Sequence, residues 1–223
     1  MKFEYLFSDC DGVIIDSEII AARVMVKYIN NFGVKIDLEE YLRTCSGKTF
    51  SGIMQSLSAK YDIPLKENFV EEITDLYMAA ATKEEKAIDG VKKAFEAISL
   101  PKAIISNGYK EQINHSVDFC QLREQFEDRV FSGVEDVEFP KPAPDIYLYA
   151  AQKMGLKPEN IIVIEDSKSG AKSAVEAGMY VIGFTGASHI LEGHDQVLLS
   201  LGVKHVIQNM SELPPLIDEI CTE

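Results

Sequence analysis

Residues 3–13 read FEYLFSDCDGV, a short apolar stretch that runs directly into two aspartates. The apolar part predicts a buried β-strand over residues 2–8. Asp9 and Asp11 are two positions apart, so in extended backbone their side chains point the same way. Gly12 then allows a sharp turn because it has no Cβ to clash. The stretch therefore predicts a strand whose carboxyl end presents a pair of acids.

Two different patterns follow this strand. Between residues 16 and 87, apolar residues recur at helical spacing and no strand signal appears. From residue 88 onward, short apolar segments alternate with helical ones, which predicts an α/β fold with a doubly wound, Rossmann-like parallel sheet. We therefore predict a core domain made of residues 1–15 and 88–223, interrupted by an all-helical cap domain of residues 16–87.

The individual elements follow from the same periodicities. The segment 161–164 is continuously apolar, as is typical of a parallel strand covered on both faces. Pro144 suits the first turn of a helix. Further core strands are predicted at 102–106, 129–131, 180–184 and 204–207, and further helices at 20–32, 38–44, 50–61, 67–81, 91–98 and 144–154.

Composition narrows the class of protein. The chain has 223 residues, of which 46% are hydrophobic and 26% charged, enough for one domain with an insertion or for two small domains. Its net charge of −14 argues against a nucleic-acid-binding protein, because the phosphates of nucleic acid need a basic surface.

No apolar run approaches the ~20 residues of a membrane helix, and the start lacks a signal-peptide core. The four cysteines are scattered, which indicates reduced thiols rather than disulfides or zinc ligands. We expect a cytoplasmic protein that does not bind membranes.

Polar side chains also follow the other predicted strands. Ser106 and Asn107 come after the strand at 102–106, and Glu165 and Asp166 come after the strand at 161–164. Lys141 lies between two prolines in the loop that leads to the Pro144 helix. In open parallel sheets, ligands bind outside the carboxyl ends of the strands. Each cluster alone is more often a turn or a helix cap, but together they predict one site.

The residue types in this predicted site suit phosphoryl transfer. One aspartate, Asp9, can act as a nucleophile and form an aspartyl phosphate, while Asp11 handles the proton if it is partly desolvated. Asp9, Glu165, Asp166 and a doubly charged phosphate would bring about five negative charges together, which require compensation. Mg²⁺, with one or two carboxylates and phosphate oxygens as ligands, and Lys141 would supply it.

These motifs resemble those of the haloacid dehalogenase-like hydrolase superfamily, in its β-phosphoglucomutase-like branch with a helical cap, along essentially the whole chain. The resemblance implies that Asp9 is the nucleophile and Asp11 the acid/base. It implies Mg²⁺ bound by Asp9, by the backbone carbonyl of Asp11 and by Asp166. Glu165 would lie beside them, either as a direct ligand or in contact with a metal-bound group. It also implies that Ser106, Asn107 and Lys141 bind phosphate. The matching stretches are 9–13 (DCDGV), 104–108 (IISNG), 139–145 (FPKPAPD) and 164–170 (IEDSKSG).

Positions at which this chain differs from particular branches of the superfamily refine the expected activity. Dehalogenases and phosphonate hydrolases of the superfamily lack the second aspartate, so Asp11 favours phosphate esters. The β-phosphoglucomutases carry a cap histidine twelve positions after the nucleophile, where this chain has Ala21, which favours hydrolysis. The substrate is expected to be a small phosphorylated metabolite, a sugar phosphate or phosphosugar acid, because the pattern is similar to that of sugar-phosphate phosphatases, including those acting on 6-phosphogluconate. Lys48, in the cap loop 46–49, is a candidate contact to the leaving group.

Three alternatives stay open at this point. A phosphosugar mutase would form an isomer without releasing phosphate. A phospho-accepting signalling module also combines aspartates, a hydroxyl residue and a lysine around Mg²⁺, but it is shorter and lacks a cap. A noncatalytic binding protein would not need the complete set of polar groups. The sequence makes no prediction of oligomeric state.

Overall fold

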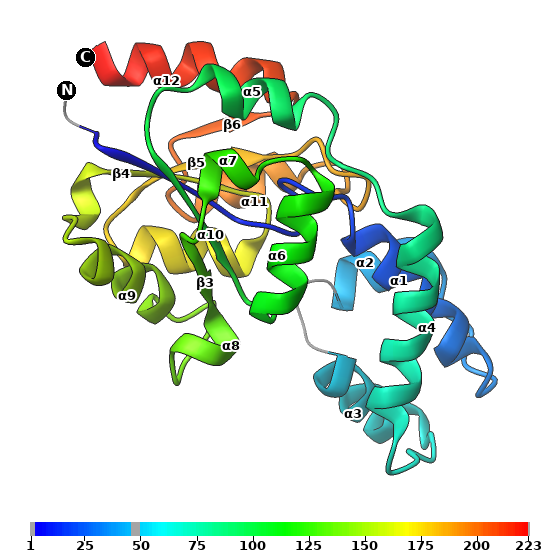
Figure 1. Cartoon of the computed structure of the whole chain (residues 1–223). Helices are drawn as coiled ribbons and strands as arrows, with labels where there is room; N and C mark the ends of the chain where they lie inside the picture. Colours follow the sequence, from blue (N-terminus) through cyan, green and yellow to red (C-terminus); the bar gives the residue numbers. More distant parts are fainter. Residues whose placement is uncertain (1–2, 46–49, 223) are drawn as a thin grey trace. The chain divides into compact units, whose positions relative to one another are not determined.

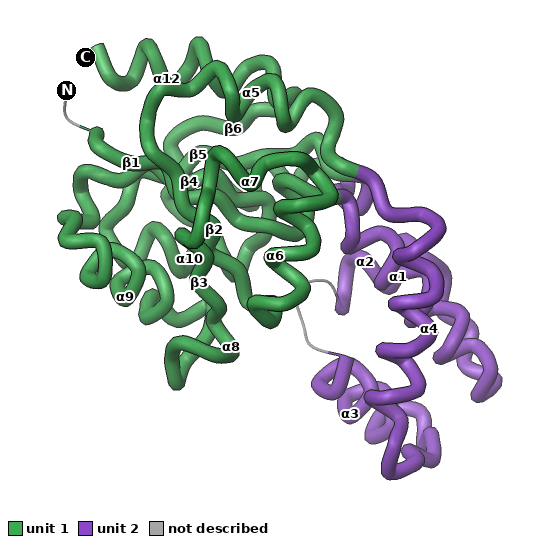
Figure 2. Tube along the Cα trace, in the orientation of Figure 1, with its two compact units in different colours: residues 1–15, 87–187, 192–223 green, residues 16–86, 188–191 purple. Residues whose placement is uncertain are grey.

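The computed structural model describes residues 3–45 and 50–222 of the chain. These residues form two compact units (Figure 2). The first unit comprises residues 1–15, 87–187 and 192–223, and the second comprises residues 16–86 and 188–191.

The first unit is built on a six-stranded sheet in which every neighbouring pair is parallel (Figure 1). The strand order is β3-β2-β1-β4-β5-β6, so the direction of winding reverses between β1 and β4. This arrangement confirms the predicted fold class. The strands are β1 (Tyr5–Ser8), β2 (Lys102–Ser106), β3 (Val130–Ser132), β4 (Ile161–Glu165), β5 (Tyr180–Phe184) and β6 (His205–Ile207).

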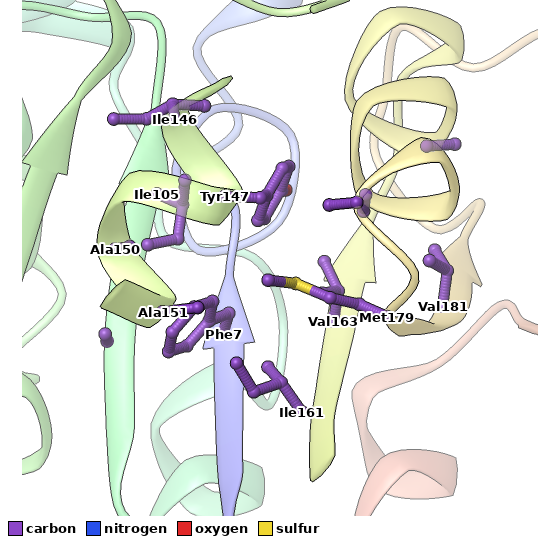
Figure 3. Packing of buried hydrophobic residues seen from close by; sticks show 14 of the residues in the cluster. Phe7, Ile105, Ile146, Tyr147, Ala150, Ala151, Ile161, Val163, Met179 and Val181 are labelled. Atoms are coloured by element: carbon purple, nitrogen blue, oxygen red, sulfur yellow. The ribbon is translucent and has the colours of Figure 1, made fainter. Parts of the chain in front are cut away.

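Both faces of this sheet are buried. On one face, Phe7, Ile105 and Val163 pack against helices α9 (Asp145–Met154) and α10 (Lys168–Glu176), which carry Tyr147 and Ala171 among their core residues (Figure 3). Side chains alternate between the two faces of a strand. The alternate strand residues, such as those at positions 6, 104 and 162, are fully buried as well. Burial on both faces explains why these strands read as continuous apolar runs.

Most helices of the first unit lie between successive strands, and the last helix follows the final strand. Pro144 caps the start of α9, and Pro214 and Pro215 fall in the first turn of α12, where a backbone N–H has no partner within the helix. The helices are α5 (Val91–Ala97), α6 (Lys110–Phe119), α7 (Arg123–Phe126), α8 (Gly133–Asp136), α9 (Asp145–Met154), α10 (Lys168–Glu176), α11 (His194–Ser200) and α12 (Leu213–Thr222), with short 3-10 turns at Pro158–Asn160 and Met210–Glu212.

The second unit is helical in its described part. Its core contains Met25, Ile29, Met54 and Ile73, which come from three of its helices. Residues 188–191 join this unit from far along the chain, and the backbone N–H and hydroxyl of Ser188 both donate to the Asp16 carboxylate. The helices are α1 (Glu18–Asn30), α2 (Leu38–Cys45), α3 (Phe50–Tyr61) and α4 (Phe69–Glu84).

Within residues 3–45 and 50–222, no helix combines the length and the apolar character that crossing a bilayer requires.

Candidate active site

The site begins where β1 ends. Asp9 follows the last residue of β1, and its backbone N–H donates to the carbonyl of Ile164 at 3.0 Å, which continues the pairing with β4. Its side chain is buried, and the residue is 7% exposed. Gly12 adopts a φ of 77°, so the chain turns back within three residues and Asp11 stays at the same strand end. Asp9 therefore lies at the position where the strand order reverses, the usual ligand site of such sheets.

Lys141 is the cation of the site. Its ammonium group donates to Asp9 Oδ1 at 2.7 Å, to Glu165 Oε1 at 2.6 Å and to the carbonyl of Ile105 at 2.7 Å. All three hydrogens of the ammonium group are thus used by groups from the ends of β1, β4 and β2. The lysine side chain is 3% exposed, so these bonds form in a protected environment.

Asn107 fixes the backbone of Lys141. Its amide donates from Nδ2 to the Lys141 carbonyl at 3.0 Å and accepts at Oδ1 from the Lys141 N–H at 3.0 Å. A Cβ atom at Gly133 would lie 2.3 Å from Asn107 Oδ1, so the small residue leaves room for this amide. The structure therefore gives Asn107 a role in holding the lysine loop, and its predicted phosphate contact stays a prediction.

The turn after β2 is fixed by two serine hydroxyls. Ser106 Oγ accepts from the Gly108 N–H at 3.0 Å, and Ser132 Oγ donates to the Gly108 carbonyl at 2.6 Å. A Cβ atom at Gly108 would lie 3.9 Å from Asp11 Oδ2, which places that carboxylate beside the turn. The structure therefore brings Ser106 and Asp11 to the same strand ends as Asp9.

Glu165, the last residue of β4, is fully buried and held on both oxygens. Besides Lys141, its Oε1 accepts from the Tyr147 hydroxyl at 3.0 Å. Its Oε2 accepts from the Ser167 N–H at 3.2 Å and the Ser167 hydroxyl at 3.1 Å. A Cβ atom at Gly170 would lie 1.7 Å from Oε1, so only glycine fits there. The carboxylate is thus positioned by the first turn of α10.

Asp166 completes a carboxylate cluster with Asp9 and Glu165. One oxygen from each of these three buried side chains lies within 4.8 Å of the other two. The backbone carbonyl of Asp166 lies 2.6 Å from Nε2 of His194, at the start of α11. This contact ties the position of Asp166 to a segment almost thirty residues further along.

The electrostatics of the cluster call for a further cation. Burial raises the pKa of Asp9 well above its ordinary value, and the negative charge of Glu165 raises it further, against the opposing effect of Lys141. Burial and Glu165 likewise raise the pKa of Asp166. Burial alone would lower the pKa of Lys141, but Asp9 and Glu165 raise it well above its usual range.

Three ionised carboxylates and one ammonium group leave two uncompensated negative charges, which one divalent cation would balance. Carboxylate oxygens gathered in this way are the ligands that a hard divalent cation prefers. The donor set therefore fits a metal ion.

The structure brings the predicted site residues Asp9, Asp11, Ser106, Asn107, Lys141, Glu165 and Asp166 to one edge of the sheet. Sequence reasoning missed Tyr147 and His194, which bond to two of these residues. Tyr147 reads as an ordinary core position of an amphipathic helix, and His194 has no motif around it. The predicted cap contact Lys48, with the rest of 46–49, lies outside the described residues.

Comparison with known proteins identifies the class. The family model of the haloacid dehalogenase-like hydrolases matches residues 5–184, and the chain belongs to this family. Its relatives include the 6-phosphogluconate phosphatase of Escherichia coli K12, 32% identical over 189 residues that cover 84% of this chain and 85% of that protein. Hexitol phosphatase A of the same organism is 29% identical and covers 82% of this chain and 83% of its own length. The chain is thus a hydrolase of this family, grouped by these relatives with the phosphatases.

Solved structures agree with this assignment. A haloacid dehalogenase-like protein of unknown function from Agrobacterium tumefaciens is 34% identical, with a TM-score of 0.90, and the match covers 98% of this chain and 99% of that one. A family hydrolase from Deinococcus radiodurans, solved with bound phosphate and sodium, is 28% identical, with a TM-score of 0.82 and coverage of 98% and 96%. The fold and the family therefore agree over nearly the whole chain.

Proposed function

We propose that this protein is a Mg²⁺-dependent phosphatase that hydrolyses a small phosphorylated metabolite, a sugar phosphate or phosphosugar acid, through an aspartyl phosphate on Asp9. The observation that carries the proposal is the buried group of Asp9, Glu165 and Asp166 with Lys141, whose two excess negative charges suit one divalent cation that can in turn bind a phosphate oxygen. Asp9, Asp166 and the backbone carbonyl of Asp11 are the groups proposed to bind the cation, with Glu165 beside them either as a further ligand or one step removed from the metal. When bound, Mg²⁺ would neutralise negative charge on the phosphate and the carboxylates.

The chemical steps are assigned to two carboxyl groups. An oxygen of Asp9 attacks phosphorus, and the bond from phosphorus to the substrate oxygen breaks while Asp11 gives that oxygen its proton. Water then attacks the phosphorus of the aspartyl phosphate and gives a proton to Asp11, so that Asp9 and inorganic phosphate are released. Asp11 is less buried than Asp9, which suits a group that exchanges protons with substrate and water.

The remaining residues are proposed to bind the phosphate. Lys141 contacts Asp9 Oδ1 and would pair with a phosphoryl oxygen on that carboxylate. Ser106 Oγ accepts from a backbone N–H, which leaves its own hydrogen to donate to the phosphate. Asn107 would contribute by holding the Lys141 loop, with a phosphate contact from its second amide hydrogen.

The substrate class is supported by the names of the relatives, which include 6-phosphogluconate and hexitol phosphatases. We therefore expect release of inorganic phosphate from sugar phosphates and phosphosugar acids in a screen with Mg²⁺ that also contains nucleotides and pyrophosphate. Product chromatography run alongside distinguishes hydrolysis from a mutase, which would form an isomer without phosphate. No phosphate release from any sugar phosphate, with the protein folded and Mg²⁺ present, would contradict the proposal.

A further inference from the structure

Tyr147 is a buried polar residue without a place in the steps above. It lies on α9 among the core residues of one sheet face, and its side chain is fully buried (Figure 3). Its hydroxyl donates to Glu165 Oε1 at 3.0 Å, and its ring centroid lies 5.0 Å from the Lys141 ammonium nitrogen. A phenylalanine would fill the same apolar volume, so the hydroxyl is the part of this side chain that packing does not require.

The partner of this hydroxyl, Glu165, has no spare bonding capacity. Lys141 and Tyr147 donate to Oε1, while the N–H and hydroxyl of Ser167 donate to Oε2. Two oxygens with about four lone-pair positions accept four hydrogen bonds. A metal ion on Glu165 would have to displace one of these donors.

We infer that Tyr147 is a positioning residue: its hydroxyl fixes Glu165 as the counter-ion that holds the Lys141 ammonium against Asp9. In this arrangement Glu165 acts on the lysine rather than as a direct metal ligand. The consequence for phosphate binding rests on the proposed function, but the Tyr147–Glu165–Lys141 linkage does not.

The linkage has a physical reason. A lysine ammonium group ends a flexible four-carbon chain, so its position depends on what its hydrogens contact. The Lys141 hydrogens are divided between Asp9, Glu165 and the Ile105 carbonyl. If Glu165 Oε1 loses the tyrosine donor, Lys141 is the remaining donor to that oxygen, and the negative charge on the oxygen attracts the ammonium group more strongly. The ammonium group is then drawn toward Glu165 and away from the oxygen of Asp9 that receives the phosphoryl group.

The test compares Tyr147→Phe with a matched control. Tyr149→Phe lies on the same helix, and Tyr149 packs its ring against Phe131 with centroids 6.2 Å apart. Three quantities are measured: the NMR cross-peak of the Lys141 ammonium group in ¹⁵N-lysine-labelled protein, assigned with Lys141→Arg, and the Kd values for Mg²⁺ alone and for inorganic phosphate with Mg²⁺.

We expect Tyr147→Phe to shift the Lys141 cross-peak and to raise the phosphate Kd about tenfold. The Mg²⁺ Kd should stay within about twofold of wild type, and Tyr149→Phe should match wild type in all three measurements. In a Glu165→Gln background, adding Tyr147→Phe should have no further effect on the cross-peak, because the hydroxyl acts through the carboxylate.

An unchanged Lys141 cross-peak in Tyr147→Phe would overturn the inference, and so would an equal weakening of Mg²⁺ and phosphate binding. Calorimetric melting checks that both variants are folded. If wild type neither binds phosphate nor releases it from any substrate, the proposed function fails, while the cross-peak comparison still decides the role of Tyr147.

Discussion

Two buried lysines lie near opposite ends of β2, and they differ in what surrounds them. Lys102, the first residue of the strand, is 3% exposed and donates to the backbone carbonyls of Ile98 and Leu100 at 2.7 and 2.8 Å. Lys141 is 7% exposed and contacts two carboxylates beside the last residues of the strand. The two lysines are buried to a similar degree, but of the two it is Lys141 whose ammonium group contacts ionised side chains.

The difference shows in the acid–base behaviour of the two side chains. Burial, with a smaller contribution from the nearby Arg129, lowers the pKa of Lys102 to about 8. The carboxylates around Lys141 reverse the effect of burial and raise its pKa. A buried lysine therefore marks a functional site through its charged neighbours and not through burial itself. The carboxyl end of the sheet has such neighbours, and the amino end of β2 has backbone carbonyls.

Removing the nucleophile at the carboxyl end of the sheet should have the largest effect on activity. We expect Asp9→Asn to lower kcat on the order of 1,000-fold or more, because an amide cannot form the aspartyl phosphate. The side-chain volume is retained, so circular dichroism and thermal melting should show a folded protein. Near-native phosphate release from this variant would contradict the assignment of Asp9.

Exchanging each lysine for methionine tests the comparison directly. Lys141→Met should lower kcat about 100- to 1,000-fold, because a charged group at the reacting phosphate is lost. Lys102→Met should leave kcat/KM within about twofold, since Lys102 lies about 13 Å along the strand from Ser106. Steady-state kinetics on both variants measure the difference. Equal losses would mean that the two ends of the sheet are not functionally distinct.

Removing the metal ion and replacing Asp166 both test whether the carboxylate cluster carries excess negative charge. EDTA should abolish activity, and added Mg²⁺ should restore it. In EDTA, Asp166→Asn should raise the free energy of unfolding by about 1–2 kcal/mol, or Tm by a few degrees, because a buried carboxylate repelled by Glu165 is gone. The same variant should lose most of the stabilisation by Mg²⁺. A variant that melts lower than wild type in EDTA would contradict the charge argument.

The sign of the pH effect follows from the raised pKa values of Asp9 and Asp166. The metal-free folded protein binds more protons than the unfolded chain, so its stability should fall as pH rises through these raised values. Mg²⁺ should reduce this dependence because it stabilises the ionised forms. Denaturant melts at several pH values, with EDTA or with Mg²⁺, measure both slopes.

Lys102 should give the smallest effect and the opposite sign. Its folded pKa of about 8 lies below the ordinary 10.5, so the unfolded chain binds more protons between these values and stability should rise with pH there. We expect a change on the order of 1 kcal/mol in wild type that is absent from Lys102→Met. Urea melts between pH 7.5 and pH 9.5, at about half-unit steps, compare the two slopes. Identical slopes would show that Lys102 is not the group responsible.

Much of the fold could be predicted from local pattern. The continuous apolar run at β4 and the acidic end of β1 predicted a parallel sheet with its ligand site at the strand ends, and the sheet is confirmed. The helix α12 was not predicted; Pro214 and Pro215 fall in its first turn, where proline is tolerated. The attachment of residues 188–191 to the helical unit depends on the contact of Ser188 with Asp16, which no local pattern shows.

The site was predicted as a set of residues but not as a network. Spacing and motif brought Asp9, Lys141 and Glu165 to one place. The bonds of Asn107 to the Lys141 backbone and of Tyr147 to Glu165 join segments 34 and 18 residues apart. Such contacts arise from tertiary packing. From the sequence alone, Asn107 is equally compatible with an ordinary turn and Tyr147 with an ordinary core position.

The most direct test of the central claim is chemical trapping of the covalent intermediate. The wild-type enzyme is mixed with a cleaved sugar phosphate and Mg²⁺, quenched in acid within one turnover, treated with borohydride and digested for mass spectrometry. Borohydride reduces an acyl phosphate to an alcohol, so we expect homoserine at position 9 in the peptide that contains Asp9 and Asp11, and no change when substrate is omitted. Phosphate release in the absence of any modified residue at position 9, or reduction at a different carboxylate, would contradict the account.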